Sequence, residues 1–181
     1  MGHTVLLLGD QTRTAFTCSI AGRPESAQVK EQWGALVTLS VRHAFESRPV
    51  TLVTVTPMEW SIAHSLPDSR HLRTGTGHFL VNQIARPSDE VLDEVAESED
   101  FRRGLLWLFA GVPAKEDRLL AIVSEVDVLS AEPVTSGEAL FLLDDGRRVR
   151  WLHPGRDAGG LRAALSAAAH DFGWRVSKEP T

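Results

Sequence analysis

The sequence predicts an α+β fold, a mainly antiparallel sheet of about five to six strands with helices packed on one face as a two-layer sandwich. Strand-like runs occur in adjacent groups rather than alternating singly with helices, which favours an antiparallel sheet over a doubly wound parallel one. The chain has 181 residues, of which 43% are hydrophobic and 24% are charged. This length and composition fit one globular domain, residues 1–181, with a core of its own.

The N-terminal part is predicted to contain a β-hairpin, a long helix and an interior strand. The runs Thr4–Leu8 and Thr14–Ile20 are separated by turn residues, which is typical of two paired strands. Apolar residues recur every three or four positions from Glu25 to Ser47, which predicts an amphipathic helix. The β-branched run Val50–Thr56 predicts the strand.

The middle of the chain is predicted to be mostly helical. Serine residues stand where they would cap two of the helices, and acidic residues follow in the first turn. The predicted helices are Met58–His64, His78–Ala85, Asp89–Ala96 after Ser88, and Glu99–Val112 after Ser98.

The C-terminal part is predicted to contain three strands and a helix. An Asp-Gly turn between two alternating runs is a strong hairpin signal. The predicted elements are a strand within Arg118–Leu129, a mobile connection Ser130–Gly137, the hairpin strands Ala139–Leu143 and Arg148–Leu152, a helix Asp157–Phe172, and a frayed tail 178–181.

Composition narrows the function classes. The net charge of −5 makes binding to nucleic acid or to an anionic membrane unexpected, and no apolar run is long enough to span a bilayer. No leader segment is recognisable, so the expected location is cytoplasmic. The excess of arginine over lysine indicates a GC-rich bacterial genome. The single cysteine, Cys18, is expected to be a buried apolar residue, and no metal or cofactor is expected.

The segment with the most distinctive pattern is Thr74–Ala85, in which Gly75 and Gly77 precede an apolar run. This pattern is typical of a loop that leads into a helix N-terminus, where backbone N–H groups bind anions. It predicts an anion site at the two glycines, with a plain turn into the helix as the alternative.

The same glycines come after a predicted helix that contains Leu36–Ala44 and a predicted strand, Val50–Thr56. This order resembles the GHKL ATPase fold of histidine kinases and anti-sigma kinases, over residues 33–87 at most. The resemblance implies a nucleotide site at the glycines. The chain departs from the family where nucleotide is held, because the first helix has no asparagine for magnesium and no Asp-x-Gly follows the strand.

Histidines are the candidate catalytic residues. His64, His71 and His78 follow one another at seven-residue intervals, and Asp68 and Glu59 are near them in sequence. If these side chains converge in a pocket, a histidine could act as a general base or the group could hold a metal. Solvent-facing histidines are the alternative. An acidic run from Asp89 to Asp100 is expected to be a solvated helix face.

Two segments are candidate interaction surfaces. Arg148 and Arg150 are expected on one face of a strand and Trp151 on the other, a pattern that fits an acidic partner or a phosphate. The alternative is an edge strand whose charges only discourage pairing with another sheet. The run Leu105–Phe109 is apolar on all sides, which predicts either a buried helix or a helical contact surface. Its interaction residues would be Leu105, Leu106, Trp107 and Phe109.

Two functions remain from the sequence. The first is a noncatalytic accessory or regulatory module of a bacterial cytoplasmic system that binds a protein partner or itself, favoured because no catalytic signature is present. The second is a small enzyme, or a binder of a small molecule or anion, with a histidine-containing site near residues 74–78.

Overall fold

The computed structural model describes residues 3–9, 15–55, 57–75, 77–113, 118, 120, 121, 123, 137–153 and 156–177. The fold is α+β, as the sequence predicted. The strands are β1 (Thr4–Gly9), β2 (Ala15–Ile20), β3 (Val50–Val55), β4 (Arg70–Thr74), β5 (Gly77–Ile84), β6 (Leu106–Ala110), β7 (Ala139–Leu143), β8 (Arg148–Leu152) and β9 (Arg175–Ser177). The helices are α1 (Ala27–Phe45), α2 (Asp89–Glu97), α3 (Glu99–Arg102) and α5 (Gly159–Asp171), with a short 3-10 helix η1 (Ile62–His64).

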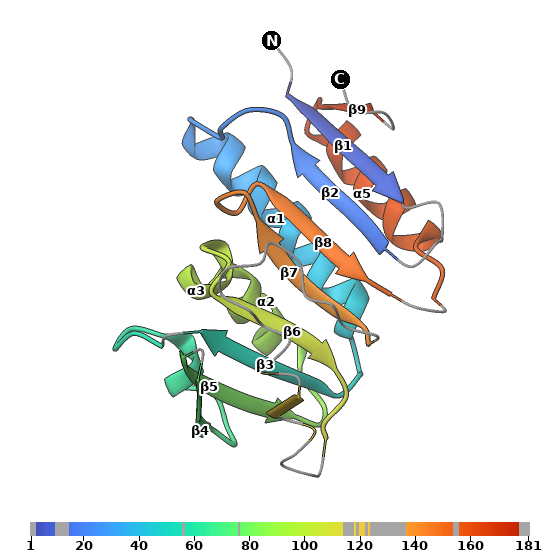
Figure 1. Cartoon of the computed structure of the whole chain (residues 1–181). Coiled ribbons are helices and arrows are strands. Elements are labelled where there is room, and N and C mark those ends of the chain that lie inside the picture. Colours follow the sequence, from blue (N-terminus) through green and yellow to red (C-terminus); the bar gives the residue numbers. More distant parts are fainter. Residues whose placement is uncertain are drawn as a thin grey trace.

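The strands form one 9-stranded sheet in the order β4-β5-β3-β6-β7-β8-β2-β1-β9 (Figure 1). Neighbouring strands are antiparallel except β1 and β9, which are parallel. The sheet therefore has more strands than predicted. The additional ones are the edge strands β4 and β9, which are short and carry polar residues, and the inner strands β5 and β6, which the pattern had assigned to helices.

The chain repeats one connection, an antiparallel hairpin followed by a helix and then a single strand. It occurs as β1-β2-α1-β3, as β4-β5-α2-α3-β6 and as β7-β8-α5-β9. The single strands β3 and β6 pair with each other, and the hairpins lie on both sides of that pair. The first hairpin and the last strand meet at one end of the sheet, where both termini lie (Figure 1).

One face of the sheet packs against α1, α2 and α5, which lie on the same side in Figure 1. Ser26 caps the start of α1 by accepting a hydrogen bond from the Val29 N–H. Trp33 on α1 is buried and donates its indole N–H to the Gly146 carbonyl at 2.7 Å. Strand residues with even spacing, such as Val5 and Leu7 on β1, complete this core.

The opposite face carries a second apolar cluster. The rings of Trp107 on β6 and Phe141 on β7 are stacked with centroids 4.5 Å apart. Val53 on β3 and Phe79 on β5 join them, as does Val123, one of the described helical residues between β6 and β7. Apolar residues thus pack on both faces of the sheet, whereas the predicted two-layer sandwich has packing on one face.

Two predicted helices are wrong. His78–Ala85 lies largely in β5, which pairs with β3 and β4. The helix predicted over Glu99–Val112 ends after α3, because Gly104 has a positive φ of 72° and the chain turns into β6. Both segments are apolar on consecutive positions because interior strands are covered on both faces, and this pattern cannot be distinguished from a buried helix.

Other predictions are confirmed. The first hairpin, α1, β3, α2 with its Ser88 cap, the hairpin β7–β8 and α5 all occur where the sequence placed them. Of the predicted strand Arg118–Leu129, residues 118, 120, 121 and 123 are described and are helical, so the strand prediction is wrong there. The remainder, the connection up to Ser136 and the tail 178–181 lie outside the described residues.

Candidate functional site

The candidate site is a groove between the loop that follows β3 and the junction of α2 with α3, here called the Trp60 groove. It encloses about 590 Å³. Buried Asp100 on α3 accepts hydrogen bonds from the Ser61 hydroxyl at 2.8 Å and from the Ile62 N–H at 3.0 Å. Since a carboxylate accepts strongly from such donors, Asp100 fixes the loop against the helices and shapes the groove.

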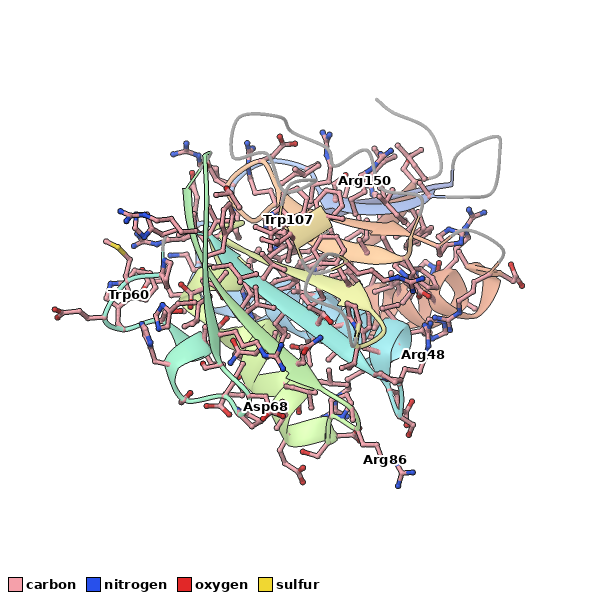
Figure 2. The ribbon with its side chains drawn as sticks, turned by 60° about the horizontal axis from the view of Figure 1, so that its bottom comes forward. Arg48, Trp60, Asp68, Arg86, Trp107 and Arg150 are labelled. Atoms are coloured by element: carbon pink, nitrogen blue, oxygen red, sulfur yellow. The ribbon has the colours of Figure 1, made fainter. Side chains whose placement is uncertain are left out.

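Trp60 stands at the rim of this groove and is 46% exposed. Figure 2 shows it at the periphery of the molecule, in contrast to Trp107 in the interior. Met58 in the same loop is 47% exposed. Among the described residues, the only large apolar side chains that are exposed are Met58, Trp60 and Val112. An exposed tryptophan beside a groove is a common feature of binding surfaces.

One face of the Trp60 ring is already in contact with a cation. The Arg103 guanidinium lies 5.6 Å from the ring centroid, which is within range of a cation–π interaction. Arg103 also forms an ion pair with Glu99, one helical turn away. We call Trp60, Arg103 and Glu99 the outer cluster.

The groove is acidic. Glu59 comes from the loop, Glu94 and Glu97 from α2, and Glu99 from α3, and all four are exposed. Among the described residues that line the groove, none is a lysine or an arginine. A concave surface lined by one sign of charge concentrates the field of that charge, so the groove favours cationic ligands.

Of the three candidate histidines, His64 and His71 lie near each other, and His64 lines the Trp60 groove. His64 lines the Trp60 groove, with its Nε2 atom 3.1 Å from the Met58 carbonyl, and its ring lies 6.3 Å from that of His71 on β4. His78 on β5 accepts a hydrogen bond from the Arg73 Nε–H at 3.1 Å. Asp68 lies in a turn with a positive φ of 51° and is exposed.

The described part of the chain brings together no group of three or more His, Cys, Asp or Glu side chains suited to a metal ion. Cys18 is buried, as predicted, and burial raises the pKa of its thiol to about 12. A neutral buried thiol is a poor nucleophile.

The glycine segment is a hairpin, not the start of a helix. Thr74 pairs with Gly77 across the end of β4 and β5, so Gly75 lies in the connection between the strands. No helix N-terminus is present at Gly77, and the anion site predicted for the two glycines loses the backbone feature on which it rested. The resemblance to the GHKL fold fails for the same reason.

The arginine strand is interior. β8 lies between β7 and β2, and its alternation is as predicted, with Arg148 and Arg150 on one face and buried Trp151 on the other. Arg148 pairs with Asp144 at 2.8 Å. Arg150 donates to the Thr17 hydroxyl at 3.5 Å. Both arginines thus have partners within the chain, and Trp151 belongs to the core.

The predicted apolar interaction helix is strand β6. Leu106 and Phe109 are buried, and Trp107 is 6% exposed. Leu105 precedes the strand and is half-buried. The run is therefore part of the core between β3 and β7, where both faces of the strand are covered.

The sequence analysis did not predict a cluster of polar side chains around Glu138. Glu138, with its side chain only 9% exposed, accepts hydrogen bonds from Arg48, Arg156 and the Trp151 indole N–H. The Arg156 guanidinium also lies 5.1 Å from the Trp151 ring centroid. We call Glu138, Arg48, Arg156 and Trp151 the inner cluster.

Charge balance in the inner cluster sets two pKa values. Burial works to raise the pKa of the Glu138 carboxyl, but the hydrogen bonds and charges of Arg48 and Arg156 outweigh it and hold the pKa below its usual 4.5. His43, whose ring contacts that of Trp151, has its pKa lowered from 6.5 by burial and by the positive charge of Arg156.

Comparison of the chain with protein-family models, with curated proteins and with solved structures finds no match. Within the described ranges, no helix combines the length and the apolar composition needed to cross a membrane. The sequence did contain a signal for the Trp60 groove, namely a tryptophan beside Glu59 and outside any apolar run. No pattern in the sequence indicated that this loop packs against the acidic helix about 35 residues further along.

Proposed function

We propose that this chain is a noncatalytic protein-interaction module, an accessory or regulatory component of a bacterial cytoplasmic system, that binds a basic segment of a partner protein in the Trp60 groove. The observation that supports it best is an exposed tryptophan at the rim of a groove of about 590 Å³ that four glutamates line. Arginine and lysine side chains match both features, because they pair with carboxylates and stack on aromatic rings.

The free energy of each contact indicates how many basic residues the partner must provide. A cation–π contact contributes about 0.5–2 kcal/mol, and an exposed ion pair about 0–1 kcal/mol. One basic residue therefore binds too weakly to matter, while a segment with several basic residues can engage Trp60 and more than one glutamate together. Since the carboxylates are exposed, added salt should weaken the interaction.

The alternative function, a small enzyme or anion binder near residues 74–78, has less support. Its anion site depended on a helix that is replaced by the β4–β5 hairpin. Its histidines lie on three elements, and His78 is hydrogen-bonded to Arg73 rather than to a carboxylate. The Trp60 groove is acidic, and it would repel the anions for which that function was inferred.

The test is a titration of the isotope-labelled chain with the peptide Ac-GRKRG-NH₂, followed by amide NMR shifts. We expect saturable shifts confined to residues 58–65 and 94–103, and weaker binding at 0.5 M NaCl than at about 0.05 M NaCl. The acidic peptide Ac-GEDEG-NH₂ is the matched control. Equal shifts from both peptides, or no saturable shift from the basic one, would contradict the proposal.

Variants locate the site. Glu94→Gln should weaken binding of the basic peptide about threefold to tenfold, since it removes one charge from the groove without removing the fold. Asp171→Asn, an equally exposed carboxyl at the end of α5, should leave binding unchanged. If both variants weaken binding equally, the attraction depends on net charge and not on the groove.

A further inference from the structure

A second groove lies on the other side of α2, between that helix and α1. It encloses about 600 Å³, which is within the usual range for small-molecule sites, and we call it the Arg102 groove. Ala35 and Leu39 on α1 line it, with Lys30 and Arg42 on the same helix and Arg102 at the end of α3. It shares only Glu97 with the Trp60 groove.

Gly34 is the feature of α1 that defines the Arg102 groove. A glycine in the middle of a helix costs about 0.5–1 kcal/mol relative to alanine, so its presence inside α1 calls for a packing reason. A Cβ atom at this position would lie 2.8 Å from Nη2 and 3.2 Å from Nη1 of Arg102. The absent side chain thus lets the guanidinium lie directly on the helix.

The Arg102 guanidinium is half-buried and only partly satisfied. Its Nε–H donates to the Ala96 carbonyl at 2.8 Å, which orients the group. Across the described residues, no carboxylate lies within ion-pair distance of Arg102 and neither Nη group has a hydrogen-bond acceptor. Burial lowers the pKa of this guanidinium, and the charge of Glu97 offsets only part of that effect. Removing a cation from water without a paired anion is unfavourable.

We propose that the Arg102 groove binds a small carboxylic acid with an apolar body, whose carboxylate accepts hydrogen bonds from the two Nη groups of Arg102. The planar guanidinium matches a carboxylate in a bidentate arrangement. The apolar body would lie along Ala35 and Leu39, and exposed Lys30 adds attraction.

The other charges that line the groove favour a single negative charge on the ligand. Arg42 is already paired with Asp93, so it offers little to a second anion. Glu31 and Glu97 line the same groove and would repel a phosphate dianion more strongly than a carboxylate. This inference does not depend on the proposed function, because the side chains that would bind the ligand differ from those of the Trp60 groove, apart from the shared lining residue Glu97, and the ligand has the opposite charge.

The experiment is a titration of the isotope-labelled chain with octanoate at pH 7 and constant ionic strength, with 1-octanol as the matched uncharged control. We expect saturable amide shifts at residues 34–39 and 97–102, and binding of octanol at least tenfold weaker. Equal affinity for both compounds, or no saturable shift with octanoate, would overturn the proposal.

Two variants test the role of the guanidinium. Arg102→Met should abolish saturable octanoate binding, whereas Arg86→Met, at an exposed arginine that lines neither groove, should retain it. Gly34→Ala tests the same group without an expected loss of folding. Alanine favours the helix, and its Cβ must displace Nη2 of Arg102 from its position on α1. We expect Gly34→Ala to keep or raise the melting temperature and to weaken octanoate at least fivefold. Unchanged affinity in both Arg102→Met and Gly34→Ala would refute the assignment.

Discussion

The inner and outer clusters contain the same three kinds of side chain and differ in burial. Each places an arginine over a tryptophan ring and pairs that arginine with a glutamate. In the inner cluster the tryptophan is fully buried and Glu138 accepts from three partners. In the outer cluster the tryptophan is nearly half exposed, and its glutamate, Glu99, is ion-paired with Arg103.

The same kinds of side chain therefore contribute differently to stability according to their access to solvent. A carboxylate removed from water is stabilised by the cations that pair with it. Removing either the carboxylate or its cation therefore leaves the other charge without compensation. An exposed carboxylate can return to water, and its ion pair contributes little to stability. The inner cluster is thus expected to hold the fold together, while the outer cluster keeps its surface available for a ligand.

The largest expected effect is the substitution Glu138→Gln. It leaves Arg48 and Arg156 without a carboxylate, which should lower the free energy of unfolding by about 2–3 kcal/mol, less than for a fully buried pair because both arginines stay about a third exposed. Glu99→Gln is the matched change in the outer cluster and should cost about 0.5 kcal/mol or less. Urea unfolding measures both. Similar losses of unfolding free energy in the two variants would mean that burial does not make the inner cluster contribute more to stability than the outer cluster.

Acid should act on the same carboxylate. The pKa of Glu138 is below 4.5 in the folded chain, so its contribution to stability is present above pH 4.5 and is lost as the pH falls through the folded pKa. The difference in unfolding free energy between the wild type and Glu138→Gln should therefore narrow as the pH falls below 4.5, as urea unfolding at a series of pH values would measure. A difference that stays constant down to pH 3 would refute this account.

A smaller effect is expected in mild acid from His43. Its folded pKa is lowered below 6.5, so the unfolded chain binds the proton more tightly and stability declines as the pH falls from 6.5 towards the folded pKa. We expect a loss of about 1 kcal/mol or less between pH 7 and 5. Thermal unfolding of His43→Gln over this range should show a flatter profile than the wild type. A wild-type profile as flat as that of His43→Gln would contradict this account.

A small effect on stability is also expected for Trp60→Ala. Because this side chain is 46% exposed, its removal should change the free energy of unfolding by about 0.5 kcal/mol. The same variant should weaken binding of the basic peptide about threefold to tenfold, since the aromatic ring is lost. A stability loss above about 2 kcal/mol would place the outer cluster with the inner one as a structural element.

The sequence predicted elements that carry local signals better than it predicted strands β5 and β6. Helix α1 has a capping serine and an amphipathic face, and the β7–β8 hairpin has an Asp-Gly turn with positive φ at Asp145 and Gly146. These are local signals that do not depend on distant residues. Strands β5 and β6 gave no such signal, because burial on both faces removes the polar positions that reveal a period of two.

The candidate site was less predictable than the fold. The acidic face of α2 was recognised as solvated, but its position opposite Trp60 depends on the hydrogen bonds of Asp100 to Ser61 and Ile62. Likewise, Gly34 gave no indication of Arg102, which lies 68 positions further along the chain in contact with it.

Local patterns in the sequence were enough to predict the α+β class, the first and last hairpins, the long helix and the buried state of Cys18, because propensity, capping and periodicity act over a few neighbouring residues. Only the tertiary structure decided which tryptophan is buried, which glutamate is paired, and which grooves exist. Those properties follow from segments that are far apart in the chain and close in space, where solvent access sets the strength of each charge.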